Sequence, residues 1–204
     1  GLGMIGIARN QPVLYFLGFG GSLMHVLNHS LFKSLLFYSA GSVYLQTHTR
    51  DINKLGGLSG YMPHTTALFL FGAVAIAGMP PLNGFISEFL IYCGLLNAIN
   101  SAGVGQITIM ILAVTGLSII GGVSLLTFTK TFSVLFLGTP RTKHEHLPEE
   151  VSTLMLIPQY LTLAAMLMVA FLPFLFLKIP VIFMNKSFLG MVSPDDSFII
   201  AHSS

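Results

Sequence analysis

Charged side chains are scarce in this sequence. Only 8% of its 204 residues are Asp, Glu, Lys or Arg, whereas soluble domains carry about 25% charged residues. Hydrophobic residues make up 53% of the chain. The composition therefore excludes an ordinary soluble domain and indicates an integral membrane protein.

Cysteines and basic clusters are also nearly absent. Cys93 is the single cysteine and lies in an apolar run, which excludes an internal disulfide, a Cys-x-x-Cys motif and a cysteine metal cage. The formal net charge of +2 is spread over short loops without a basic run, so nucleic acid is not an expected partner. The chain begins Gly1-Leu-Gly-Met, with neither an initiator methionine nor a charged n-region followed by a cleavage site, and we expect it to be a fragment that starts inside a larger membrane protein.

Four apolar regions predict an all-α, polytopic transmembrane bundle. In chain order they cover residues 13–46, 64–99, 106–137 and 152–177. Residues 1–11 fit the tail of a preceding helix, and the apolar patch after residue 177 is too short to span a bilayer. We therefore assign residues 1–177 to a transmembrane domain and 178–204 to an extramembrane tail.

The first region is long for a single crossing. A helix over residues 13–46 would measure about 51 Å at 1.5 Å per residue, against a hydrocarbon core of about 30 Å. It must be strongly tilted, broken near Gly18–Gly21, or project from the membrane.

The second region is interrupted by a helix-breaking motif. Two glycines and two prolines lie within seven positions: Gly78, Pro80, Pro81 and Gly84. They cannot continue a helix, and they free backbone groups that must find partners inside the protein. The region is therefore either a hairpin of two spans or one discontinuous span.

Loop charge favours one of these alternatives. Arg50 and Lys54 precede the second region, and Arg141 and Lys143 follow the third. If the second region crosses once, both basic loops face one side, which the positive-inside rule makes cytoplasmic. We favour a single discontinuous span, a recurrent device of ion-coupled transporters.

Three ionisable residues lie four apart in the first region: His25, His29 and Lys33. On a helix they fall along one side, about 40° apart per step. A lysine near the bilayer centre costs about 3 kcal/mol even on a mild scale, so it usually serves a proton or ion path. The alternative is a lysine that snorkels to an interface, but apolar residues continue to Leu45. We interpret Lys33 as a buried relay residue.

The two histidines allow three interpretations. A His-x-x-x-His pair on a helix can bind zinc, but zinc needs further ligands, and no acidic residue or cysteine stands nearby in the sequence. Histidine titrates near neutrality and can pass a proton between its ring nitrogens. We favour a proton relay through His25 and His29, with hydrogen-bonded packing and metal binding as the alternatives.

Two further ionisable residues lie in apolar regions. Glu88 is four residues after Gly84, and a carboxylate there must be neutral, paired or hydrated, all of which suit a proton carrier. An interfacial Glu88 is the alternative. Lys130 lies seven residues before the end of the third region, where a relay role and a snorkelling anchor are equally compatible with its position.

These motifs carry a family resemblance. His25-Val-Leu-Asn-His-Ser-Leu-Phe-Lys-Ser-Leu-Leu-Phe and Gly78-Met-Pro-Pro-Leu-Asn-Gly-Phe-Ile-Ser-Glu-Phe resemble the antiporter-like subunits of respiratory complex I and its Mrp-type relatives. Within that superfamily, Pro80 to Glu88 and Phe136-Leu-Gly-Thr-Pro-Arg most resemble the large membrane subunit of formate hydrogenlyase and hydrogenase-4-type complexes.

The resemblance implies a fold and residue roles. Such subunits have fourteen transmembrane helices in two inverted repeats, and this chain would hold the last four spans. Lys33 would be the central-axis lysine and His25 and His29 its relay neighbours. Glu88 would end the second half-channel, where the distal complex I subunit has lysine.

The resemblance also implies a function. We expect a proton-translocating subunit of a hydrogenase, formate hydrogenlyase or complex I-type oxidoreductase, in a bacterial or archaeal cytoplasmic membrane. It would hold no catalytic centre, no metal and no cofactor, and redox groups would sit in partner subunits. The alternatives are a Mrp-type cation/proton antiporter subunit, which could move sodium, and a structural membrane scaffold.

Overall fold

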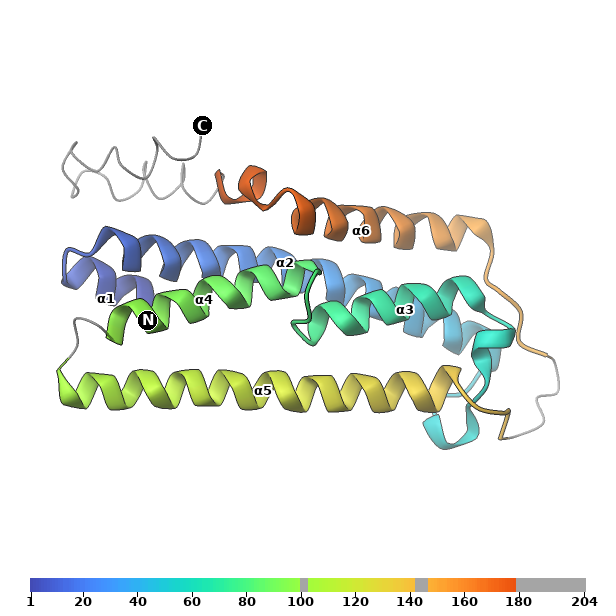
Figure 1. Cartoon of the computed structure of the whole chain (residues 1–204). Coiled ribbons are helices and arrows are strands. Elements are labelled where there is room, and N and C mark those ends of the chain that lie inside the picture. Colours follow the sequence, from blue (N-terminus) through green and yellow to red (C-terminus); the bar gives the residue numbers. More distant parts are fainter. Residues whose placement is uncertain (100–102, 142–146, 179–204) are drawn as a thin grey trace.

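The computed structural model describes residues 1–99, 103–141 and 147–178, and every regular element within them is helical (Figure 1). The elements in chain order are α1 (Leu2–Ala8), α2 (Pro12–Thr47), η1 (Ile52–Lys54), η2 (Leu58–Gly60), α3 (Pro63–Ile76), α4 (Asn83–Ile99), α5 (Val104–Phe136) and α6 (Thr153–Phe171). The all-α fold class is confirmed. The fourteen-helix repeat stays a prediction.

Helix α2 runs without a break. Proline occupies its first turn, where the missing N–H costs nothing, and the helix ends at His48 in a left-handed conformation. Its 36 residues measure about 54 Å. A break near Gly18–Gly21, one of the three alternatives for this region, is therefore wrong. Gly18 instead admits close packing of α1, because a Cβ there would overlap the backbone of Gly3.

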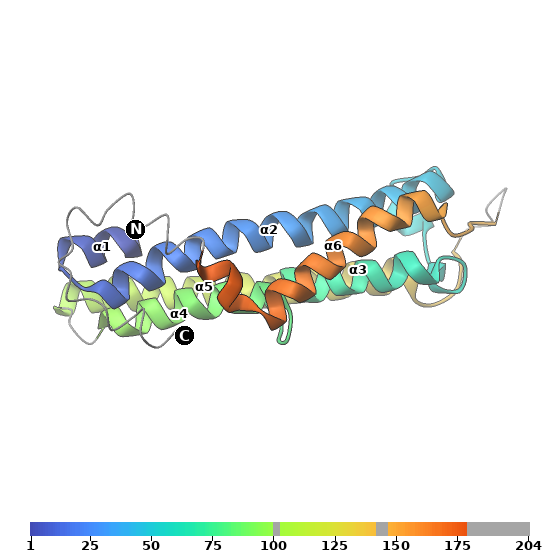
Figure 2. The ribbon, with the colours of Figure 1, turned by 90° about the horizontal axis from the view of Figure 1, so that it is seen from above.

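Helices α3 and α4 follow each other end to end alongside α2 (Figures 1 and 2). At one end of α2, Gly94 of α4 packs on Leu17, and at the other a Cβ on Gly72 of α3 would lie 2.9 Å from the side chain of Leu36. Since α2 is antiparallel to both pieces, the second region is one discontinuous span. The hairpin alternative is wrong.

Two helices of the described residues, α5 and α6, are long and apolar enough to cross a membrane. Helices α3 and α4 are shorter apolar helices of 14 and 17 residues. Each is too short to cross a core of about 30 Å alone at 1.5 Å per residue, whereas the two in line suffice.

The last apolar region ends earlier than expected. Helix α6 stops at Phe171 because Pro173 follows and lacks the N–H needed to continue. Residues 173–178 form a separate short helical segment. Apart from Lys178, the tail assigned to 178–204 lies outside the described residues, so the domain boundary stays a prediction.

A buried polar cluster joins α6 to α2. Ser39 Oγ donates to Gln159 Oε1 at 3.1 Å, and Gln159 Nε2 donates to Ser42 Oγ at 3.1 Å. All three side chains are buried. Leu35 and Met166 pack in the apolar cluster between the same helices, so α6 is held by both directional and apolar contacts.

A carboxylate from a distant loop caps the start of α3. Glu150 Oε2 accepts from the backbone N–H groups of His64 (2.7 Å) and Thr65 (3.2 Å), and its Oε1 accepts from Thr65 Oγ1 at 2.6 Å. These N–H groups belong to the first turn, which has no partners within the helix. The negative charge also lies at the positive end of the helix dipole.

The two loops predicted to share one side do lie together. The N–H of Gly57 donates to the carbonyl of Leu137 at 3.0 Å, and a Cβ on Gly56 would contact the Thr139 carbonyl. Arg50 and Arg141 therefore lie at the same end of the bundle, and Lys143 lies outside the described residues. That this end faces the cytoplasm stays a prediction.

Thiol labelling tests this orientation in the full-length protein. In a Cys93→Ala background, Gly60→Cys and Thr139→Cys should react with a membrane-impermeant reagent from one side only, and Gly103→Cys from the other. Gly60 and Gly103 have open space around a Cβ, so the substitutions fit. If Gly60→Cys and Thr139→Cys label from opposite sides, the single crossing of α3 and α4 is wrong.

Candidate functional site

The candidate site lies where α2 faces the break between α3 and α4. The antiparallel seam pairs Gly21 of α2 with Ile91 of α4, then His25 with Ser87, and then Asn28 with Asn83. These α2 residues recur every three to four positions, which is one face of a helix. His25, His29 and Lys33 form an ionisable stripe along α2. Its first residue, His25, therefore faces the second half of the discontinuous span.

Helix α3 ends with its last carbonyls satisfied. Gly78, at φ 67°, adopts the left-handed conformation that favours glycine. Its N–H donates to Ala75 O at 3.1 Å and the Met79 N–H donates to Val74 O at 3.2 Å, which is a Schellman motif. Ser124 Oγ of α5 donates to Ile76 O at 3.3 Å. The regular hydrogen bonding of α3 therefore ends at Gly78.

The other three break residues lie at different positions around the break. Pro80 and Pro81 form the turn between Met79 and Leu82, and Gly84 lies in the first turn of α4. A Cβ on Gly84 would overlap the carbonyl oxygen of Ala75. Only a glycine lets the start of α4 approach the end of α3 this closely.

Glu88 reaches back to the break. The side chain is half-buried, and a Cβ on Gly78 would overlap its Oε2. Side chains on a helix tilt toward its N-terminus, which carries Glu88 from the second turn of α4 to the end of α3. The carboxylate therefore lies at the junction of the two half-helices.

The stripe on α2 turns gradually away from α4. His25 is half-buried and its Nδ1 lies 3.2 Å from Ser87 Oγ. The rings of His25 and His29 have centroids 5.9 Å apart, and His29 is exposed in the described chain. Lys33 is half-buried with Nζ 5.8 Å from the Phe37 ring centroid. The structure thus brings the two histidines together and continues the stripe to Lys33.

Lys33 and Glu88 form no ion pair, although both belong to the described residues. Each step of about 40° along the stripe rotates the next side chain further from the α2–α4 seam. A proton path between the two would therefore run through intermediate groups, of which His25 and His29 are the ones that the stripe supplies.

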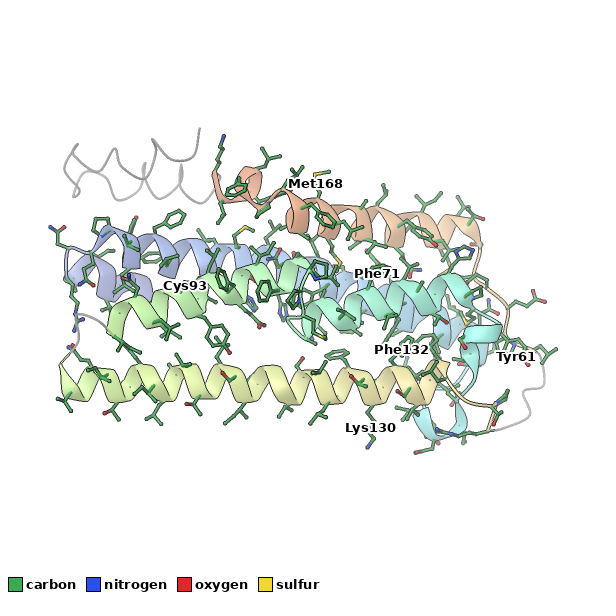
Figure 3. All side chains as sticks on the ribbon, in the orientation of Figure 1. Tyr61, Phe71, Cys93, Lys130, Phe132 and Met168 are labelled. Carbon is green, nitrogen blue, oxygen red and sulfur yellow. The ribbon has the colours of Figure 1, made fainter. Side chains whose placement is uncertain are left out.

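Lys130 lies elsewhere. It is exposed on α5 and points away from the bundle, whereas Phe132 points inward (Figure 3). Phe132 stacks on Phe69 of α3 with ring centroids 6.5 Å apart. The structure does not bring Lys130 together with the α2 stripe, and its role as relay or anchor stays a prediction.

Three polar residues at the seam were absent from the sequence-based candidates: Asn28, Asn83 and Ser87. A signal existed for the first, because Asn28 is three residues after His25 and shares its helix face. The other two follow the break within one turn of Gly84 and Glu88. Their partners could be identified only once α4 was placed against α2.

Within residues 1–99, 103–141 and 147–178, no three His, Cys, Asp or Glu side chains gather closely enough to hold a metal ion. Zinc at the His25 and His29 pair would need ligands from outside this part of the chain. The described residues instead place hydrogen-bonding groups one after another in space, an arrangement that suits proton transfer.

Comparison with known proteins identifies relatives of this chain. The family model described as "NADH:quinone oxidoreductase/Mrp antiporter, TM" matches residues 4–121. Formate hydrogenlyase subunit 3 of Escherichia coli (strain K12) is 49% identical over 144 residues, covering 70% of this chain and 24% of that protein. Hydrogenase-4 component B of the same organism is 38% identical over 175 residues, covering 83% and 25%. The chain thus spans about a quarter of the length of these relatives.

A solved structure shares the fold. The Mrp complex from Dietzia sp. DQ12-45-1b matches with a TM-score of 0.68 at 18% identity, over 81% of this chain and 37% of that chain. The helical arrangement of Figure 1 is therefore shared by a chain of that solved complex.

Proposed function

This chain belongs to the NADH:quinone oxidoreductase/Mrp antiporter transmembrane family, and from that premise we propose that it relays protons within an antiporter-like membrane subunit. Relatives named as subunits of formate hydrogenlyase and hydrogenase-4 support assembly with redox partners. The subunit would lie in a bacterial or archaeal cytoplasmic membrane. Redox cofactors would be held by the partner subunits.

One observation carries the proposal: an ionisable stripe on a continuous helix meets the break of a discontinuous helix. Irregular backbone at membrane depth is tolerated only where protein or a wet cavity satisfies it. Here Glu88 lies at the junction and His25 contacts α4 one turn away. Two ionisable side chains and a helix break thus occupy the same level of the bundle.

The hydrogen bonds at Ser87 define the neutral form of His25. Ser87 Oγ donates its single proton to Gly84 O at 3.0 Å, so it can only accept from the histidine 3.2 Å away. The His25 Nδ1 then carries the proton and Nε2 is the free acceptor. A proton arriving at Nε2 converts the ring to imidazolium, which passes a proton onward.

The proposal is tested at Glu88. Glu88→Gln keeps shape and hydrogen bonding but cannot ionise, whereas Glu88→Asp keeps ionisation with a reach shorter by about one bond, roughly 1.5 Å. We expect Glu88→Gln to lower proton uptake into vesicles by at least about tenfold at equal complex content, and Glu88→Asp to retain part of it.

Glu149→Gln is the matched control, because it makes the same change at an exposed loop carboxylate. It should leave uptake at the wild-type level. Full uptake by Glu88→Gln would remove Glu88 from the path, and the reverse order of the two Glu88 variants would indicate an anchor of the half-helix.

A further inference from the structure

We propose that Asn28 and Asn83 are positioning residues of the proton path, which set the register of α4 on α2 and thereby hold Ser87 against His25. This inference rests on the proton relay proposed above. It concerns two amides that exchange no protons themselves and act through a neighbouring contact.

The two amides form a reciprocal pair. Asn28 Nδ2 donates to the backbone carbonyl of Asn83 at 2.8 Å, and Asn83 Nδ2 donates to Asn28 Oδ1 at 3.1 Å. Both side chains are 0% exposed. Hydrogen bonds shielded from water are stronger and more directional than exposed ones, so the pair fixes distance and rotation together.

The pair acts at the first residue of the half-helix. Asn83 begins α4, and Ser87 lies one turn later on the same face. On α2, Asn28 lies three residues after His25. Fixing Asn83 to Asn28 therefore fixes where Ser87 meets His25, 3.2 Å away.

Neighbouring contacts along the seam are less specific. Gly21 meets the aliphatic side chain of Ile91, and Gly94 meets Leu17. Apolar contacts of this kind are non-directional, so they favour close approach without selecting one register. A slip of one residue would rotate Ser87 by about 100° away from His25.

The Asn28–Asn83 pair leaves one acceptor without a hydrogen bond in the part of the chain that the structure describes. Asn83 Oδ1 is buried and has no hydrogen-bond partner among the described residues. A buried acceptor that makes no hydrogen bond lowers the stability of the fold. By contrast, the amide oxygen and nitrogen of Gln159 both have partners on α2. The Asn28–Asn83 pair therefore leaves one amide oxygen of α4 without a partner among the described residues, whereas the Gln159 contact leaves none.

The test uses the full-length protein in its assembled complex, reconstituted in vesicles. Asn28→Leu removes both hydrogen bonds at similar volume. The double variant Asn28→Leu/Asn83→Leu removes the paired amides together, which leaves no unpaired side-chain donor and favours assembly. Gln159→Leu is the control, since it removes buried hydrogen bonds between α2 and α6 away from the histidines.

Proton uptake per assembled complex and its solvent deuterium isotope effect are the readouts. We expect both Asn variants to lower uptake by about tenfold and to raise the isotope effect, because a misplaced proton-transfer step becomes rate-limiting. Gln159→Leu should lower the amount of complex while leaving both readouts per complex unchanged. In a Ser87→Ala background, adding Asn28→Leu should lower uptake no further.

Wild-type uptake and isotope effect in the double Asn variant would overturn the positioning role while the relay itself stands. A loss by Asn28→Leu that multiplies with that of Ser87→Ala would also overturn it. Absence of proton uptake by the wild-type complex would instead refute the proposed function, and the inference with it.

Discussion

Replacing Lys33 with methionine should lower proton uptake per assembled complex by about 100-fold, the loss typical of removing a proton-transfer group. Methionine keeps the length and the apolar stem of the side chain but cannot carry a charge. Lys33 has no ion-pair partner among the described residues, and its ammonium lies near the face of Phe37. Its removal therefore leaves no opposite charge buried, and assembly should remain near normal.

Uptake is measured in vesicles driven by the turnover of the complex, with the subunit quantified in each preparation. Lys54→Met is the control, because it removes a lysine from the exposed loop before α3. An assembled Lys33→Met complex that takes up protons at the wild-type rate would end the relay hypothesis for this lysine.

Replacing Gly84 with alanine should destabilise the assembled subunit by about 3 kcal/mol, at the upper end of the range for overpacking. The added methyl would overlap the backbone oxygen of Ala75, which no side-chain rotation can relieve. The start of α4 would have to move away from the end of α3. The measurements are the amount of subunit incorporated into membranes and its thermal stability in detergent.

Gly122→Ala is the matched control for this effect. Gly122 lies in α5 with open space around a Cβ, and alanine favours a helix interior by about 1 kcal/mol over glycine. It should be neutral or slightly stabilising. Equal behaviour of the two variants would mean that the close approach at Gly84 does not hold the half-helices together.

The discontinuous span could be predicted because its causes are local. Gly78 supplies the left-handed residue that ends α3, and two prolines prevent continuation. That the two basic loops lie at the same end of the bundle followed from the single crossing predicted for the second region. By contrast, the uninterrupted course of α2 through its glycines could not be predicted, because the packing of α1 and α4 against Gly18 and Gly21 involves residues distant in sequence.

The candidate site was predictable in its ionisable residues and not in their partners. Isolated charges in apolar runs are visible in a sequence because burying them is costly. The Asn28–Asn83 and His25–Ser87 contacts join residues 55 and 62 positions apart. Helical periodicity places Asn28 beside His25 on one face, but it carries no information about which helix that face meets.

The cap on α3 has a consequence for the order in which the protein is made. His64 and Glu150 are 86 positions apart, so at about 5–20 residues per second the ribosome adds the carboxylate about 4–17 s after the helix start that it caps. During this interval α5 is synthesised and the first turn of α3 lacks this acceptor. The first turn of α3 therefore gains its capping carboxylate only after α4 and α5 have been synthesised, so this contact is among the late ones to form as the chain is made.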